Sequence, residues 1–189
     1  MIYKHIPIFF LILFASCGVY SYKGTLPPNI NNMSIAAITN NTSEFLFTNI
    51  LNDDLYETII ENNIIEIVDS KGADSILEIN IDKINDSPEI YSLNDDIYGS
   101  INKWKMELFV DVKWVNLIDG TVIVDKKFSK WAIYNTSGLD IKYDGIDNDS
   151  DGLLDSEDSD EYGAPRESAI KIIVSKISNQ IINELTSTW

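Results

Sequence analysis

Residues 104–114 read WKMELFVDVKW, and this stretch decides the fold of the chain. Every second residue from Trp104 to Trp114 is apolar, and the residues between them are charged except for Phe109. Strict alternation over this length predicts a strand with one buried face. Residues 121–134, TVIVDKKFSKWAIY, follow a turn and form the expected partner strand of an antiparallel hairpin.

The charges on these two segments choose between two registers for the hairpin. A two-residue loop would place Lys113 opposite Lys126, whereas a three-residue loop formed by residues 118–120 places opposite charges across two pairs. Opposite charges across a strand pair are stabilising and like charges are destabilising. The three-residue loop is therefore favoured, and it pairs Lys113 with Asp125 and Asp111 with Lys127.

Two amphipathic helices are predicted, one before and one after these strands. Apolar residues recur at steps of three and four from about Ser43 to Asn62 and again after Pro165, which gives each helix one apolar stripe. Asn41-Thr42-Ser43-Glu44 supplies capping residues for the first helix, and Pro165 suits the first turn of the second. The stripes are Phe47, Ile50, Leu51, Leu55 and Ile59 in the first helix and Ile170, Ile173, Val174, Ile177, Ile181 and Leu185 in the second.

Shorter apolar runs complete the expected fold. Residues 33–38, 64–68 and 77–81 are predicted strands, and residues 85–100 are expected to form a polar loop. Two amphipathic helices and a sheet with one apolar face can bury one another. We therefore expect an α+β fold, a two-layer sandwich of a mainly antiparallel four- or five-stranded sheet packed against two helices.

Composition excludes several classes of function. The 189 residues include 14 basic and 30 acidic ones, for a net charge of −16. Such an acidic chain does not suit the phosphate backbone, so we expect no nucleic-acid partner. The single His5 and the single Cys17 both lie near the N-terminus, and the rest of the chain therefore offers neither a Ser-His-Asp triad nor a His-ligated zinc site. We expect a protein that is not an enzyme.

The N-terminus has the form of a bacterial lipoprotein signal. Lys4 precedes an apolar run, residues 6–15, that is too short to span a bilayer. Phe14-Ala15-Ser16-Cys17 resembles the lipobox, in which small residues precede an acylated cysteine, although Phe14 stands where Leu is preferred. The alternative is a signal peptide cut elsewhere, with Cys17 a stray thiol. The position of Cys17 at the end of the apolar run favours the lipobox.

Lipidation of Cys17 sets the expected organisation of the chain. The cysteine would carry a diacylglycerol and an N-acyl chain, and two or more acyl chains give a stable membrane anchor. Gly18 follows it, where an Asp would resemble the inner-membrane retention signal, so the outer membrane is favoured. The expected parts are a signal peptide at 1–16, a lipidated tether at 17–32 and a single domain at 33–189 with an acidic insertion at about 138–163.

The acidic insertion contains a candidate calcium loop. Residues 140–161 hold ten acidic residues and Lys142 as their one basic residue. Within them, residues 147–158, DNDSDGLLDSED, resemble loops of the EF-hand, dockerin or thrombospondin type 3 kind, in which oxygen ligands converge around a glycine turn. EF-hands place Glu at the last position, whereas dockerin-like loops accept Asp. The predicted ligands are Asp147, Asp149, Asp151, the carbonyl of Leu153, Asp155 through water, and Asp158; the alternative is a solvated acidic linker.

The beginning of the mature chain resembles the outer-membrane LPS-assembly lipoproteins of the LptE family. The residues that carry the resemblance are Cys17-Gly18-Val19-Tyr20-Ser21-Tyr22 with Gly24, then Leu26-Pro27-Pro28, the strand at 34–36, the Asn40-Asn41 turn with the helix after it, and the last helix up to Trp189. The resemblance implies an α+β lipoprotein inside or against an LptD-type β-barrel, where it supports barrel assembly and the passage of lipopolysaccharide to the outer leaflet. The acidic insertion is not part of this pattern.

The aromatic and basic residues of the hairpin admit two interpretations. Trp104, Trp114, Trp131 and Tyr134 suit packing within the sheet, or a surface for contact with a barrel or acyl chains. The lysines suit a solvated sheet face, or the phosphates of lipid A: Lys103, Lys105, Lys113, Lys126, Lys127 and Lys130. Two functions follow, a calcium-stabilised lipoprotein of the lipopolysaccharide translocon and, as the alternative, a calcium-dependent surface or adhesion lipoprotein with no barrel partner.

Overall fold

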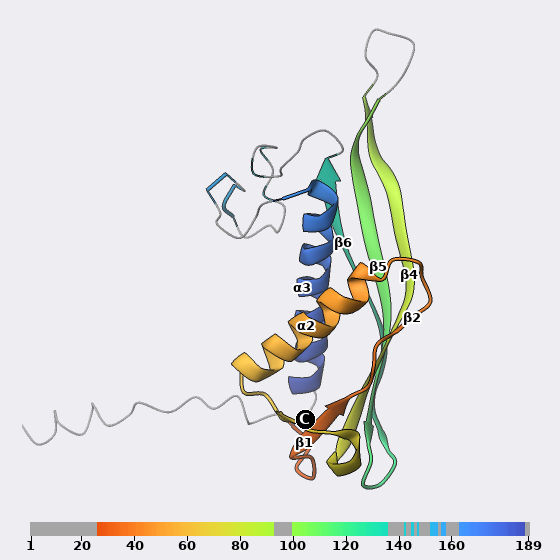
Figure 1. Cartoon of the computed structure of the whole chain (residues 1–189), viewed down its shortest axis with the longest axis vertical. Helices are drawn as coiled ribbons and strands as arrows, with labels where there is room; N and C mark the ends of the chain where they lie inside the picture. The colour runs from red at the N-terminus through yellow and green to blue at the C-terminus, as the bar shows by residue number, and fades with distance from the viewer. Residues whose placement is uncertain are drawn as a thin grey trace, which may run out of the picture.

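A computed structural model of the chain describes residues 26–92, 100–135 and 163–187, together with 142, 145, 147, 152–154 and 156–157. Within these residues, six strands form one open sheet, and two α-helices pack on one face of it (Figure 1). The expected α+β two-layer sandwich is confirmed. In the described parts of the chain, no helix is long and apolar enough to cross a membrane.

Three long antiparallel strands form the body of the sheet. They are β4 (Ser75–Ser92), β5 (Ser100–Asn116) and β6 (Val122–Asn135). The central strand is β5, which pairs with β4 along its whole length and with β6 from Lys103 to Val115. This arrangement gives β5 a hydrogen-bonded neighbour on both sides.

Three short strands extend the sheet beside β4. Both β1 (Asn32–Ile35) and β2 (Thr39–Asn40) run parallel to β4 along the same edge, and β3 (Glu66–Ile67) runs parallel to β1. The expected strand at 33–38 is therefore interrupted. The Ala36 N–H still donates to the carbonyl of Leu77, at 2.9 Å, but the chain leaves the edge of β4 before β2 begins.

The two helices bury the inner face of the sheet. They are α2 (Leu46–Glu61) and α3 (Pro165–Thr186), and the even-numbered residues of β5 from Met106 to Trp114 face them. The predicted stripes are confirmed, because all their residues are buried except Ile50, which is partly buried against the core. The core also reaches back into the expected tether, where Ile30 is buried.

The start of α2 differs from the expectation. The helix begins at Leu46 after Phe45 and has no side-chain cap, so the predicted capping role of residues 41–44 is wrong. These residues build the turn ahead of the helix instead. The Thr42 N–H donates to Asn40 Oδ1 at 2.8 Å, and the Glu44 N–H donates to Thr42 Oγ1 at 3.2 Å. Short polar side chains stabilise such turns as readily as they cap helices.

The first part of the expected polar loop at 85–100 is strand. Residues 85–92 extend β4, and Asn85, Asp86 and Ser87 pair with β5. The pairing with β5 has a register shift after Ile81 and another after Pro88, and it continues beyond both. Pairing with β2 ends at Ile81, so this half of β4 is a sheet edge, where polar residues and proline are tolerated. Because this half of β4 is polar, its sequence shows no alternation of apolar residues that would predict a strand.

The register of the β5–β6 hairpin is confirmed, but its loop is not as expected. Lys113 lies opposite Asp125, and Asp111 lies opposite Lys127. The Asn116 N–H donates to the carbonyl of Thr121 at 2.9 Å, so the four residues 117–120 form the loop. The pairing with β6 shifts by one residue between Trp114 and Val115. This bulge compensates for the additional loop residue, so the expected pairs are kept.

Candidate functional site

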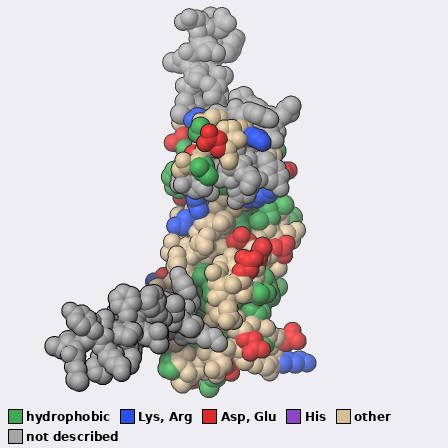
Figure 2. Space-filling model, turned by 90° about the vertical axis from the view of Figure 1, so that its left-hand side faces the viewer, with side chains coloured by type: hydrophobic (Ala, Val, Ile, Leu, Met, Phe, Trp, Pro, Cys, Tyr) green, Lys and Arg blue, Asp and Glu red, His purple; other side chains and the backbone are tan. Residues whose placement is uncertain are grey.

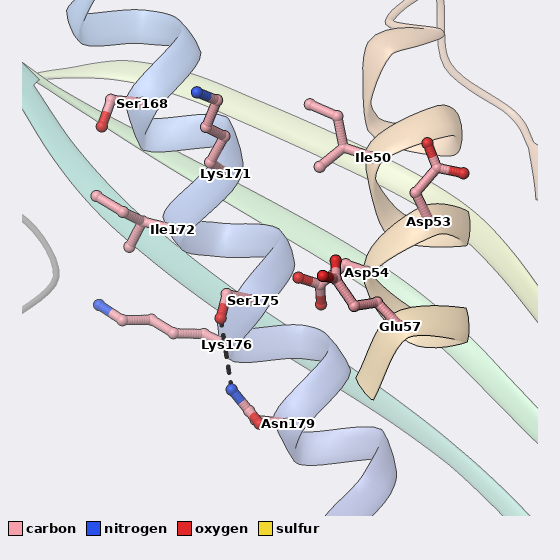
Figure 3. A pocket seen from close by; sticks show the side chains of 10 residues that line it. All are labelled: Ile50, Asp53, Asp54, Glu57, Ser168, Lys171, Ile172, Ser175, Lys176 and Asn179. Atoms are coloured by element: carbon pink, nitrogen blue, oxygen red, sulfur yellow. Dashed lines mark hydrogen bonds between the residues drawn. The ribbon is translucent and has the colours of Figure 1, made fainter. Parts of the chain in front are cut away.

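A groove of about 590 Å³ lies between the two helices on the side facing away from the sheet (Figure 3). Helix α2 contributes the carboxylates Asp53, Asp54 and Glu57, and helix α3 contributes Lys171 and Lys176. Acidic side chains gather near the middle of this side of the molecule (Figure 2). The groove is lined mainly by charged and polar groups, and this suits contact with a charged partner better than enclosure of an apolar ligand.

The opposite face of the sheet is the second candidate surface. Neither α2 nor α3 covers it (Figure 1). Its charges are paired across strands, because Lys127 Nζ lies 3.0 Å from Asp111 Oδ1 and Lys113 faces Asp125. Trp131 is 49% exposed on this face. The face therefore combines an exposed aromatic ring with a nearly balanced set of charges.

Cation–π contacts organise the aromatic rings of this outer face. Lys105 Nζ lies 4.9 Å from the centroid of the Trp131 ring, and Lys83 Nζ lies 6.0 Å from that of Phe109. Each ammonium group sits within the distance at which a ring attracts it. The contact with Lys105 favours one position of the Trp131 ring at the surface, as a pre-ordered aromatic anchor requires.

The lysines of the hairpin do not form one basic patch. The odd-numbered ones share the outer face, whereas Lys126 and Lys130 lie on the side of the helices. There Lys126 pairs with Glu184, and Lys130 Nζ lies 3.1 Å from Gln180 Oε1 of α3. The aromatic residues also divide, because Trp114 is fully buried and Tyr134 nearly so. Of the two interpretations given above, packing applies to these two residues and a surface role is left to Trp131.

A polar cluster ties both helices to the upper part of the sheet. Tyr134 Oη donates to the Asp86 carboxylate, at 2.8 and 2.9 Å from its two oxygens. Arg166 Nε lies 3.4 Å from Asp86 Oδ2, and Arg166 Nη2 lies 2.9 Å from Glu44 Oε1. The four residues come from β6, β4, the start of α3 and the turn before α2. The cluster thus joins four segments that are distant in the sequence.

Sequence reasoning missed this cluster, because its members belong to no motif. One signal was available: Arg166 is the only arginine of the chain. A guanidinium group carries several donors in a fixed geometry and can serve two carboxylates at once. Burial and the hydrogen bond with the Asp86 carboxylate raise the pKa of Tyr134 to about 12. The phenol is therefore held as a neutral donor, which is a structural role.

The structure describes two of the predicted calcium-ligand residues, Asp147 and Leu153, at the end of the molecule where α3 begins (Figure 1). The Gly152 N–H donates to Asp147 Oδ2 at 2.9 Å, and Gly152 has φ +102°, which favours glycine. The Gly152 N–H thus lies against the carboxylate of the first predicted ligand. Asp149, Asp151, Asp155 and Asp158, and also Cys17, lie outside the described residues.

In the described ranges, no group of three or more His, Cys, Asp or Glu residues is placed to hold a metal ion.

The fold is one found in bacterial lipoproteins. A Xanthomonas campestris protein of the family model DUF330 superposes with a TM-score of 0.52 at 10% identity, covering 84% of this chain and 87% of that one. The uncharacterized lipoprotein B of Nitrosomonas europaea gives 0.51 at 14% identity, covering 86% and 84%. The rare lipoprotein B of Shewanella oneidensis gives 0.46 at 16%, covering 83% and 95%. No protein-family model and no curated protein matches the sequence.

Replacing Tyr134 with Phe should lower the free energy of unfolding by about 1–3 kcal/mol at pH 7, because the half-buried Asp86 carboxylate keeps Arg166 but loses its short hydrogen bond from the phenol. The pKa of the folded phenol lies above its ordinary value of 10.0, so the hydroxyl stabilises the fold below pH 10. That contribution is lost as the pH rises through about 12. The difference in the free energy of unfolding between the parent and Tyr134→Phe should therefore become smaller as the pH rises from 10 to about 12.

Urea unfolding of the chain from Gly18 onward, at pH 7 and at several values between 10 and 12, measures both effects. Tyr56→Phe, at a partly buried position of α2, is the matched control and should change neither stability nor its pH dependence. If the free energy of unfolding changed with pH in the same way for the parent and for Tyr134→Phe, the hydrogen bond between the phenol and Asp86 would not contribute to stability as expected.

Proposed function

We propose that this chain is a lipid-anchored outer-membrane lipoprotein of the LptE type. It would support assembly or function of an LptD-type β-barrel and the insertion of lipopolysaccharide into the outer membrane, as a binding module and not as an enzyme. One observation carries this proposal: the lipobox cysteine, Cys17, and the residues after it precede a domain with the fold of lipoprotein B from Nitrosomonas europaea.

The outer face of the sheet is the surface that best suits a barrel partner. Exposed aromatic residues commonly act as anchors at protein interfaces, and Trp131 is held in place by Lys105. Charge pairs such as Lys127 with Asp111 leave little uncompensated charge to desolvate. The interior of a membrane β-barrel is polar, so it can complement a face of this kind.

Lipopolysaccharide would meet the same face. Lys105 supplies an ammonium group at the Trp131 ring, Lys103 lies further along β5 opposite Asn135, and a phosphate accepts charge-assisted hydrogen bonds from such groups. Contact with lipopolysaccharide is thus proposed for this end of the outer face and not for Lys126 or Lys130, which serve α3.

We also propose that residues 147–158 bind calcium. The contact between Gly152 and Asp147 supports a loop that closes around a cation, and carboxylate and carbonyl oxygens are the ligands calcium prefers. Calcium bound there would neutralise carboxylates that otherwise repel one another. The same loop supports the alternative function, a calcium-dependent surface or adhesion lipoprotein with no barrel partner. The proposed ligands are Asp147, Asp149, Asp151, the carbonyl of Leu153, Asp155 through water, and Asp158.

The tagged full chain, extracted from its own membranes in mild detergent, should co-purify with an outer-membrane β-barrel protein identified by mass spectrometry. Trp131→Glu should reduce barrel recovery at least severalfold, because it places a charge in the proposed contact. Lys176→Glu, in the helix groove, is the control and should leave recovery unchanged. Recovery of no barrel protein with the unmutated chain would contradict the translocon proposal and favour the surface lipoprotein.

Calcium should raise the melting temperature of the chain from Gly18 onward relative to chelator. At a free calcium concentration of about 100 times the dissociation constant, linkage adds roughly 2.7 kcal/mol. Asp149→Asn combined with Asp151→Asn should abolish the increment, whereas Asp53→Asn combined with Asp54→Asn removes as many charges from α2 and should retain it. Equal melting temperatures of the unmutated chain with calcium and with chelator, by calorimetry, would mean that the insertion is a solvated linker.

A further inference from the structure

The β5–β6 turn lies at the end of the molecule opposite the start of α3 (Figure 1). Leu117 and Ile118, in the turn, are 45% and 62% exposed, and Val122, just after it, is 50% exposed. We call these three residues the apolar base. Neither the core nor the outer sheet face uses them.

Four of the five backbone N–H groups from Leu117 to Thr121 have acceptors within the protein. A backbone N–H that enters an apolar medium without an acceptor costs several kcal/mol, so this property decides whether a turn can approach lipid. The described donors and acceptors are Leu117 N–H to Asp74 O at 2.8 Å, Ile118 N–H to Asn116 Oδ1 at 2.8 Å, Gly120 N–H to Asn116 O at 2.9 Å, and Thr121 N–H to Asp119 Oδ1 at 3.0 Å. The turn thus presents two aliphatic side chains on a closed backbone.

The apolar base lies where the N-terminal segment joins the fold. Asp74 connects the two, because its carbonyl accepts from Leu117 and its carboxylate accepts from the Asn31 N–H at 2.9 Å. A hollow of about 670 Å³ beside them is lined by Leu26, the first described residue, and by Ile60. The turn, the hollow and the beginning of the described chain therefore share one end of the molecule.

Chain length decides which end a lipid anchor can hold at a membrane. Cys17 precedes Leu26 by nine residues, and a fully extended chain of that length spans at most about 30 Å. The 17 residues of β5 span about 55 Å, so the far end of the sheet is beyond that reach. An acylated Cys17 thus keeps the end of the molecule that carries the apolar base within reach of the bilayer, and the far end of the sheet out of its reach.

We propose that the apolar base rests on the lipid bilayer, with Leu117 and Ile118 inserted among the headgroups. The proposal rests on the lipid anchoring proposed above. Asp119 limits the depth, because hydrogen bonds from the Thr121 N–H and hydroxyl hold the pKa of its carboxyl below the usual value and keep it charged. Asp119 follows Ile118 and Asp74 adjoins Leu117; these acidic residues disfavour an anionic surface, so the surface that fits is zwitterionic phospholipid.

Depth-dependent fluorescence quenching on phosphatidylcholine vesicles tests this proposal with the acylated full chain. Ile118→Cys, labelled with an environment-sensitive fluorophore, should be quenched several times more strongly by headgroup-labelled lipid than Ser87→Cys, which lies on the far half of β4. Both positions are at the surface, so labelling should leave the fold intact, and melting temperatures verify this.

A second pair of variants tests the role of the aliphatic side chains. With the label at Val122→Cys, the double variant Leu117→Asp and Ile118→Asp should lose most of the quenching. Phe45→Asp with Leu46→Asp, an exposed apolar pair at the start of α2 away from the base, should retain it. Equal quenching of the labels at positions 118 and 87, or none at 118, would overturn the proposal and leave the base to a protein partner.

Mass spectrometry of the same preparation distinguishes a failure of the proposed lipid anchoring from a failure of the proposed bilayer contact. A chain without acyl groups on Cys17 would overturn the lipid anchoring and the apolar base together. An acylated chain whose label at position 118 is not quenched would overturn the base alone.

Discussion

The strand β5 imposes the constraint on which the other elements depend. Its alternating pattern gives it one apolar face, and its pairing with β4 and β6 fixes that face in the middle of the sheet. Exposed aliphatic and aromatic surface on this scale is unfavourable in water, so the face requires cover. Helix α3 supplies most of it, and α2 completes it toward the short strands. The charged residues between the apolar ones of β5 keep the other face open.

The molecule therefore differs between its two ends as well as its two faces. Toward the β5–β6 turn, the inner face of the sheet is apolar, and the turn itself exposes aliphatic side chains to the surroundings. Toward the start of α3, β4 becomes polar and has no neighbour beyond Ile81. There the Tyr134–Asp86–Arg166–Glu44 cluster substitutes for apolar packing and fastens the edge strand to both helices. The described chain begins at the first end, and the described residues 152–154 of the acidic insertion lie at the second (Figure 1).

Periodic features of the sequence predicted the fold well, because burial acts on every turn of a helix and every second residue of a strand. The stripes, the sheet and the charge-paired register all follow from such repetition. Features that depend on one contact were missed. The capping residues before α2 had two equivalent local uses, the polar half of β4 needed a partner strand to be recognised, and the cluster around Arg166 joins residues far apart in the chain.

The candidate sites show the same division. The proposed lipid anchor at Cys17 and the calcium loop are local motifs, so the sequence alone suggested them, and the described part of the loop brings Gly152 to Asp147. The apolar base is not visible in sequence, since Leu117 and Ile118 read only as a loop between two strands. Only the hydrogen bonds of Asp74 bring the turn beside the beginning of the chain.

Amide hydrogen exchange of the chain from Gly18 onward tests most directly whether β5 organises the structure. Amides from Met106 to Trp114 should exchange most slowly, because they are bonded to strands on both sides and lie under α3. Amides of β2 and β3, at the edges, should exchange fastest among the strands. Protection of β5 no greater than that of β2 and β3 would contradict the account.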